Sequence, residues 1–433
     1  MDAKNLPAHP DRGQYEELAE DFLSAYSSGE PEALRRIADY YNPDHPLTLE
    51  MLRAGAQRRL GKLLDSELAP NDLALAHAQL LVAHSHGFES WQALVSHIDA
   101  INTENSPTSQ FEFAADAVIN GDVATLELLL RKNPELIRTR ASREHGAALL
   151  HYVAANGVED FRQRTPTNAV DVANLLLDAG AEVDADLAYG LSPSLRARYP
   201  ERVGSTTLGL VATSIHPVHA GVQIALMETL LDAGAALDGI KEGWGFVNSC
   251  LANGRPAAAQ FLAGRGALLD LEGAAGVGRL DLVRSFFNED GSLKPPATKA
   301  QMESGFMWAC EYGHTRVVEF ILERGLDVGT QVGGMTGLHW AMVGGRVETT
   351  RSLLERKAPL ETQNSYGGTV LGCAIWAVGN TDLAYRWPDS DTDWAAIVGM
   401  LIDAGAVVYE SDSDFPTGNE RVDELLRRHG MKP

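Results

Sequence analysis

Two neighbouring stretches of this chain carry the same pattern with an offset of 32 residues, and this repeat limits what the chain can fold into more than any other feature. The stretch 303–331 is ESGFMWACEYGHTRVVEFILERGLDVGTQ, and 335–363 is MTGLHWAMVGGRVETTRSLLERKAPLETQ. The two match in phase, with Gly313 aligned to Gly345. Each predicts a small turn, a short helix, a glycine stop, a second helix ending in two apolar residues, and a small-residue loop.

Each part of the unit has a physical cause. Small alanines on the first helix let neighbouring helix pairs approach closely, and the glycine supplies the positive φ that ends this helix. The second helix presents an apolar stripe at helical spacing. One unit cannot bury this stripe alone, whereas stacked units bury a continuous core. The repeat therefore predicts an all-α solenoid of helix pairs.

The unit resembles the ankyrin-repeat family, whose repeat of about 33 residues carries T-P-L-H-x-A followed by glycine. The family positions are occupied by Thr336, Leu338, His339, Ala341 and Gly345. Two positions depart from the family: Gly337 replaces the usual proline, and Lys357–Ala358 stands where glycine-alanine is usual. The resemblance implies that His339 and His151 are structural and hydrogen-bond turn backbone. It implies binding in general and no specific partner.

Weaker copies extend the predicted array to residues 111–412. The second, third and last copies contain extra residues between their helices, about 11, seven and 14 respectively. Without these inserts the array has about 34 residues per repeat, which predicts about eight repeats.

The flanks are predicted to be helical. Residues 14–101 have apolar residues at three- and four-residue spacing, which predicts an N-terminal helical domain with Ser90 as an N-cap. The segment AHAQLLVAHSHGFESWQALVSHI looks like a helical segment seen ahead of ankyrin arrays in bacterial proteins. The polar run 102–110 is predicted to be a linker. Residues 413–433 include NERVDELLRRHG, an amphipathic helix suited to capping the stack.

Net charge restricts the partners. The formal charge is −23, which repels nucleic acid and anionic membranes over long range, so we expect neither as a partner. A basic partner or simple solubility explains this charge. No apolar stretch suggests a leader or a membrane span, so we expect a cytoplasmic monomer.

Metal and catalytic sites are not indicated. His84 and His86 point to different sides of a helix, and no cysteine or carboxylate completes a tetrahedral set with them. Asp389, Asp391 and Asp393 alternate as in a calcium loop, but the glycine and glutamate that such a loop requires are missing, which favours a solvated loop with Asp393 as a helix cap. We expect no metal, no cofactor and no catalytic residue.

Aromatic residues form the most informative cluster. Trp308 and Trp340 occupy the same repeat position, Tyr312 follows Trp308 by four residues, and Trp376 lies on the corresponding helix of the next repeat. Arg346 lies nearby, and arginine with aromatic residues is typical of binding hot spots. Either these side chains form a partner-binding row on the concave face, or some of the rings fill gaps between inner helices.

The last insertion adds Tyr385 and Trp387 to the candidate binding residues, within NTDLAYRWPDSDTDW at 380–394. Long inserts in compact repeats are often functional, although surface decoration is the alternative. The leading hypothesis is a non-enzymatic scaffold that binds a protein or peptide on the concave face of repeats six to eight. The alternative is a small molecule or carbohydrate bound near the insertion. A hydrolase built from loop carboxylates and histidines is a third, weaker hypothesis.

Overall fold

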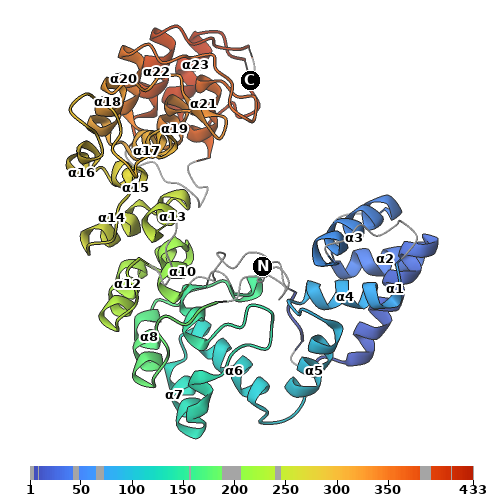
Figure 1. The fold of residues 1–433 in the computed structure, drawn as a ribbon. Helices are drawn as coiled ribbons and strands as arrows, with labels where there is room; N and C mark the ends of the chain where they lie inside the picture. Colours follow the sequence, from blue (N-terminus) through green and yellow to red (C-terminus); the bar gives the residue numbers. More distant parts are fainter. Residues whose placement is uncertain are drawn as a thin grey trace. The chain divides into compact units, whose positions relative to one another are not determined.

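The computed structural model describes residues 4–7, 9–41, 48–64, 73–155, 158–187, 206–238, 245–380, 392–410 and 412–432. Contacts divide the chain into two compact units, Met1–Ala236 and Leu237–Pro433. Both are mostly helical, as predicted (Figure 1).

The first unit contains both α-helices and short 3-10 helices. The α-helices are α1 (Arg12–Ser28), α2 (Pro31–Tyr41), α3 (Leu49–Leu64), α4 (Leu75–Ser85), α5 (Trp91–Ile101), α6 (Pro107–Asn120), α7 (Val123–Lys132), α8 (Ala169–Asp178), α10 (Thr207–Thr213), α11 (His216–His219) and α12 (Gln223–Asp232). The 3-10 helices are η1 (Pro134–Arg138), η2 (Leu149–Ala154) and η3 (Asp160–Arg162).

Helices α1 to α5 share an apolar core that includes Phe22, Leu60, Phe88 and Leu94. The predicted N-cap Ser90 is confirmed, because its side chain accepts a hydrogen bond from the backbone N–H of Ala93 at the start of α5. The predicted linker 102–110 is too long, because its last four residues belong to a helix. Helix α6 begins at Pro107 with Ser106 as its N-cap, because proline suits the first helical turn and serine accepts a bond from Ser109 N–H.

The second predicted repeat departs from the expected helix pair. Its first helix is the 3-10 helix η2, which ends at Ala155 with a φ of 58°. The predicted insertion after it contains η3, and the third copy's insertion contains the short helix α11. Nevertheless, His151 has the expected structural role. Its Nδ1 accepts from Ala148 N–H, so Nε2 carries the proton and donates to the Ala185 carbonyl over 2.9 Å.

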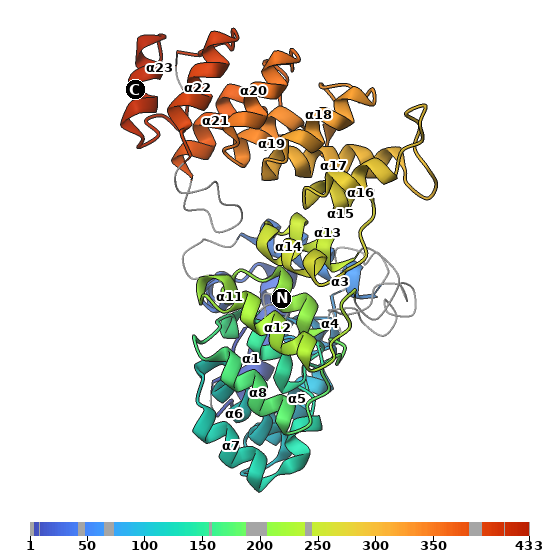
Figure 2. The same cartoon turned by 90° about the vertical axis from the view of Figure 1, so that its left-hand side faces the viewer.

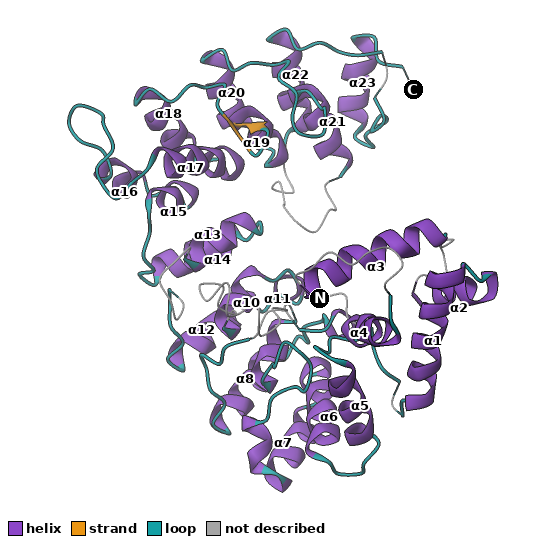
Figure 3. Cartoon of the chain, turned by 45° about the vertical axis from the view of Figure 1, so that its right-hand side comes forward, coloured by secondary structure: helices purple, strands orange, loops and turns teal. Residues whose placement is uncertain are grey.

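The second unit contains α13 (Phe246–Ala252), α14 (Pro256–Gly264), α15 (Leu271–Gly276), α16 (Leu280–Ser285), α17 (Lys299–Tyr312), α18 (Thr315–Glu323), β1 (Gln331–Val332), β2 (Met335–Thr336), α19 (Gly337–Val343), α20 (Val347–Glu355), α21 (Val370–Gly379), α22 (Trp394–Asp403) and α23 (Glu420–Arg428). The two strands form an antiparallel hairpin just before α19, drawn in orange in Figure 3.

The helices of the second unit stack in two rows (Figure 2). Helices α17, α19 and α21 pack side by side in one row, and α18, α20 and α22 do so in the other. The small inward alanines predicted for the first row are buried, among them Ala309, Ala341 and Ala374. One apolar core runs from Leu271 through both rows to Leu426 of α23. The second unit is thus a stack of helix pairs, and α23 packs against α22 at its end.

Turn chemistry follows the sequence pattern closely. Gly313 and Gly345 adopt positive φ values of 78° and 63° and end the first helices of their units. His339 lies within a cap: its Nδ1 accepts from Thr336 N–H over 3.3 Å, and its Nε2 lies 3.4 Å from the Gly368 carbonyl. Lys357 adopts a φ of 60°, the conformation that glycine takes in the equivalent turn at Gly325.

Candidate functional site

The aromatic row predicted on α17 and α19 forms a contiguous cluster. The rings of Trp308 and Tyr312 stack with centroids 6.3 Å apart and an interplanar angle of 19°. The rings of Trp308 and Trp340 are tilted by 48°, with centroids 6.4 Å apart. The structure therefore brings three of the predicted residues into contact.

Two of these side chains are held by the fold. Trp308 Nε1 donates to Glu272 Oε1 of α15 over 2.8 Å, and Tyr312 donates its hydroxyl hydrogen to the Leu251 carbonyl over 2.5 Å. Helix α17 packs against the short helix α15, where Gly276 leaves room for Leu251 and for the Cβ atom of Trp308. A Cβ atom at Gly276 would lie 2.4 Å from Leu251 Cδ1 and 3.1 Å from Trp308 Cβ. Gap filling thus accounts for part of the aromatic row.

Glu272 gives this region a polar edge. Its side chain is buried, and the burial raises its carboxyl pKa above the ordinary value, while the Trp308 hydrogen bond acts in the opposite direction. Nearby, Asp270 accepts hydrogen bonds from Asn248 and Gln301. Carboxylates of α15 and its N-cap therefore lie beside the aromatic rings of α17.

Arg346 also contacts the backbone of the stack. Its Nε donates to the Glu311 carbonyl over 2.8 Å, which joins the turn before α20 to the end of α17. A Cβ atom at Gly344 would lie 1.9 Å from the same oxygen, so this turn lies directly against α17. This contact gives Arg346 a structural role beside the predicted binding role.

Trp376 differs from the other tryptophans of the row. It lies on α21 and is 39% exposed, whereas Trp308 and Trp340 are partly buried. A large exposed apolar ring is typical of the residues that a partner protein buries on binding. Tyr385 and Trp387, the other two predicted binding residues, lie outside the described residues.

Two exposed aromatic residues were missed by the sequence analysis. Tyr366 is 91% exposed in the turn before α21, and Tyr409 is 54% exposed in the loop after α22. Tyr366 follows Asn364 and precedes Gly367, and an aromatic residue inside such a glycine turn could have signalled a solvent-facing ring. Tyr409 had no comparable signal.

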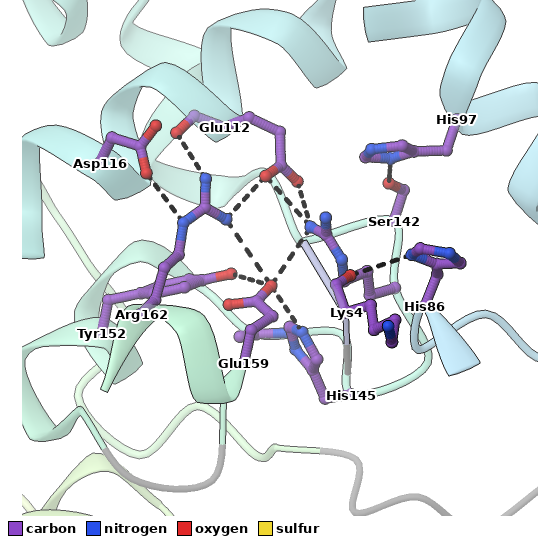
Figure 4. A network of polar contacts seen from close by, with 12 residues as sticks. Lys4, His86, His97, Glu112, Asp116, Ser142, His145, Tyr152, Glu159 and Arg162 are labelled. Carbon is purple, nitrogen blue, oxygen red and sulfur yellow. Dashed lines mark hydrogen bonds and ion pairs between the residues drawn. The ribbon is translucent and has the colours of Figure 1, made fainter. Parts of the chain in front are cut away.

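A buried network of charged residues in the first unit was also missed (Figure 4). Arg162, from the insertion in the second predicted repeat, lies 2.7 Å from Glu112 Oε2 and 2.9 Å from Asp116 Oδ1, both on α6. Arg143 lies 2.9 Å from Glu112 Oε1. Glu159, from the same insertion, lies 3.3 Å from Arg143. The insertion is therefore bound to α6 through buried ion pairs.

Glu159 is the centre of this network. Its Oε1 accepts from the Tyr152 hydroxyl over 3.0 Å and lies 3.0 Å from His145 Nε2, which carries the ring proton because Nδ1 accepts from Ala147 N–H. Burial tends to raise the pKa of Glu159, but the contacts with His145 and the two arginines outweigh it and lower the pKa to about 2. The carboxylate is thus held in its charged form. Glu159 and its partners Arg143 and His145 are buried, whereas Asp116 at the edge of the network is exposed.

This network does not resemble a catalytic or metal site. Its ionised groups are paired with one another. No group of three or more potential metal ligands occurs among the described residues. Asp393 caps α22 by accepting from Ala396 N–H, as predicted, while Asp389 and Asp391 lie outside the described part of the chain.

The stacked helix pairs define the second unit as a helical-repeat structure. A comparison with protein families shows which repeat family this segment resembles. Residues 274–385 match the family described as ankyrin repeats (3 copies). The resemblance inferred from Thr336 to Gly345 is thereby confirmed, while the predicted total of eight repeats stays a prediction. The match includes Trp308, Trp340 and Trp376.

No match to the chain was found among curated proteins. Ankyrin repeats suggest a role in protein interaction and imply protein partners in general, and the family is typically non-catalytic. No helix within the described ranges is long and apolar enough to cross a membrane.

Proposed function

We propose that this protein is a non-enzymatic scaffold whose helices α17, α19 and α21 bind a partner protein or peptide. The observation that carries the proposal is the 39% exposure of Trp376 on α21, which belongs to the same row as α17 and α19 in the matched ankyrin segment. Exposed tryptophans are over-represented among the residues that dominate binding energy. Trp340 lies on the neighbouring helix α19, where its ring contacts that of Trp308.

Charge supports a basic partner. The chain carries 36 basic and 59 acidic residues, and Glu272 and Asp270 lie on the inner helices and adjoining turns of the same unit. Like charges repel before contact, so an acidic partner would approach this surface slowly. A basic segment would be attracted to it.

Hydrogen exchange tests the location of the site. Proteins captured from a source-cell lysate would be added one at a time to the full chain, and exchange would be compared with the free chain. A partner that binds as proposed slows exchange in α19 and α21 and leaves α18 and α20 unchanged. Protection confined to α18, α20 and α22 would overturn the assignment.

The carbohydrate alternative has no specific observation in its favour. It places the ligand near the insertion 380–394, of which residues 381–391 lie outside the described residues. We therefore develop the protein-binding proposal alone.

A further inference from the structure

A small cavity lies at the start of α21, on the helix that carries Trp376. Its volume is about 130 Å³, and its walls combine apolar residues, among them Leu371, Ile375 and Met431, with polar ones, among them Gln363 and Thr369. An apolar cavity of about 150 Å³ accommodates a molecule the size of benzene, so this one suits a single side chain. It is too small for typical small-molecule sites, which measure about 300 Å³ or more.

The cavity and Trp376 share one face of α21. Gly372 lines the cavity, and Trp376 follows it by four residues, a spacing that places both on the same side of a helix. A peptide that covers Trp376 would therefore extend to the cavity within a short length of chain.

The charge of the residues that line the cavity determines which side chain it suits. Asp412 is the single charged residue among the described residues that line it. Its Oδ1 accepts from Asp414 N–H over 2.9 Å, while its Oδ2 lies 3.9 Å from the point that a Cβ atom on Gly372 would occupy. The nearby cation Lys432 is paired with Glu410 at 3.0 Å.

The N-terminus of α21 also borders the cavity and has the opposite sign. A helix N-terminus carries a partial charge of about +0.5, which offsets roughly half of the Asp412 charge. In addition, the Thr369 side chain accepts from Gly372 N–H and so occupies part of that terminus. The net charge of the residues that line the cavity remains negative, and its walls are partly apolar and partly polar.

We propose that this cavity receives one cationic side chain, an arginine or lysine, from the partner segment that covers Trp376. The apolar stem of such a side chain would pack on Leu371, Ile375 and Met431, and its positive end would face the Asp412 carboxylate. The inference rests on the proposed function, because it assigns chemistry to the partner of the same surface. It makes Asp412 a residue that determines specificity.

A titration with capped amino acids tests this without the partner. The probes are N-acetyl-arginine amide and its neutral isostere N-acetyl-citrulline amide, added to the full chain with labelled methionine methyl groups. The Met431 signal reports on the cavity and is assigned with a Met431→Leu variant. We expect arginine amide to bind about tenfold more tightly than citrulline amide, because only the cation interacts with the Asp412 charge.

Three variants separate charge from shape. Asp412→Asn keeps an acceptor for Asp414 N–H and should remove the preference for arginine amide. Asp403→Asn, an equal charge change at an exposed position on α22, should leave it intact. Gly372→Leu should block both probes, because a side chain there would extend into the cavity. Equal binding of both probes, or a preference that survives Asp412→Asn, would overturn the inference.

The two proposals can fail separately. If partner binding depends on Trp376 but the cavity shows no cation preference, this inference alone is wrong. If the cavity prefers arginine amide while partner binding is indifferent to Trp376, the proposed binding surface alone is wrong.

Discussion

Trp308 and Glu272 are joined across two neighbouring repeats by a hydrogen bond of 2.8 Å between the indole nitrogen and the carboxylate. The bond holds the Trp308 ring over α15, and Tyr312 stacks on it. Trp308 and Tyr312 therefore help to hold the repeats together, whereas Trp376 faces solvent.

Replacing Trp308 with phenylalanine should therefore affect stability. The variant keeps an aromatic ring but leaves Glu272 Oε1 without its donor, and an unsatisfied buried acceptor costs about 1–3 kcal/mol. Urea denaturation of the second unit, followed by tryptophan fluorescence, measures the change. Trp376→Phe is the matched control and should change the free energy of unfolding by less than about 0.5 kcal/mol, since its ring is exposed. Equal decreases in the free energy of unfolding for Trp308→Phe and Trp376→Phe would contradict the structural role of Trp308.

The insertion in the second predicted repeat should be essential for the first unit. Arg162→Met leaves Asp116 without its cation and Glu112 with Arg143 alone, and breaking a buried ion pair costs about 3–5 kcal/mol. Arg131→Met is the control, because its pair with Glu127 is exposed and is worth less than about 1 kcal/mol. Pulse proteolysis in urea, with cleavage within residues 73–187 identified by mass spectrometry, compares the two variants. A small effect of Arg162→Met would show that the insertion is decoration.

Acid should weaken the first unit before it protonates Glu159. Burial lowers the pKa values of His86, His97 and His151 to about 4, so these rings stay neutral in the fold. The unfolded chain binds protons near pH 6.5, and stability therefore falls as the pH drops from 6.5 toward 4. At pH 5 the loss is about 2 kcal/mol for each histidine.

The same proteolysis assay at pH 7 and pH 5 measures this dependence. His97→Gln removes one of the three groups and should reduce the difference between the two pH values by about a third. The change in unfolding free energy between pH 7 and pH 5 is informative even if His97→Gln is less stable at both pH values. An unchanged slope would contradict the assignment of His97 as a buried neutral ring.

Lys357 occupies a turn position that favours glycine. Its φ of 60° lies in the left-handed region, which costs a residue other than glycine about 1–2 kcal/mol. Part of this is offset by the greater flexibility of unfolded glycine, so Lys357→Gly should stabilise the second unit by about 1 kcal/mol. The reverse change, Gly325→Ala in the equivalent turn at a φ of 91°, should destabilise it although the site has room for a methyl group. Thermal unfolding measures both changes.

The sequence predicted those parts of the fold that depend on local chemistry. Gly313 ends α17, and Thr336 and His339 cap α19, because each effect acts within a few residues. Lys357 was noted as a departure from the family, and its positive φ is the structural consequence. The start of α6 was misplaced because a polar run with one proline fits a linker and a helix start equally well.

Contacts between distant residues could not be predicted. The pairs of Arg162 with Glu112 and of Tyr312 with Leu251 join positions 50 and 61 residues apart. Nothing in the order of residues shows that a polar insertion folds inward or that a tyrosine spans a neighbouring helix. For the same reason, the sequence grouped Trp308 with Trp376, whereas their exposure differs.

The affinity of a Trp376→Ala variant for a captured partner tests the central claim most directly. Calorimetry would compare the wild-type chain with Trp376→Ala and with Phe113→Ala, an exposed aromatic residue of the first unit that is 58% exposed. If α21 presents the binding surface, Trp376→Ala loses about 2 kcal/mol or more of binding free energy, while Phe113→Ala binds as the wild type does. Equal affinity of Trp376→Ala and the wild type would contradict the account.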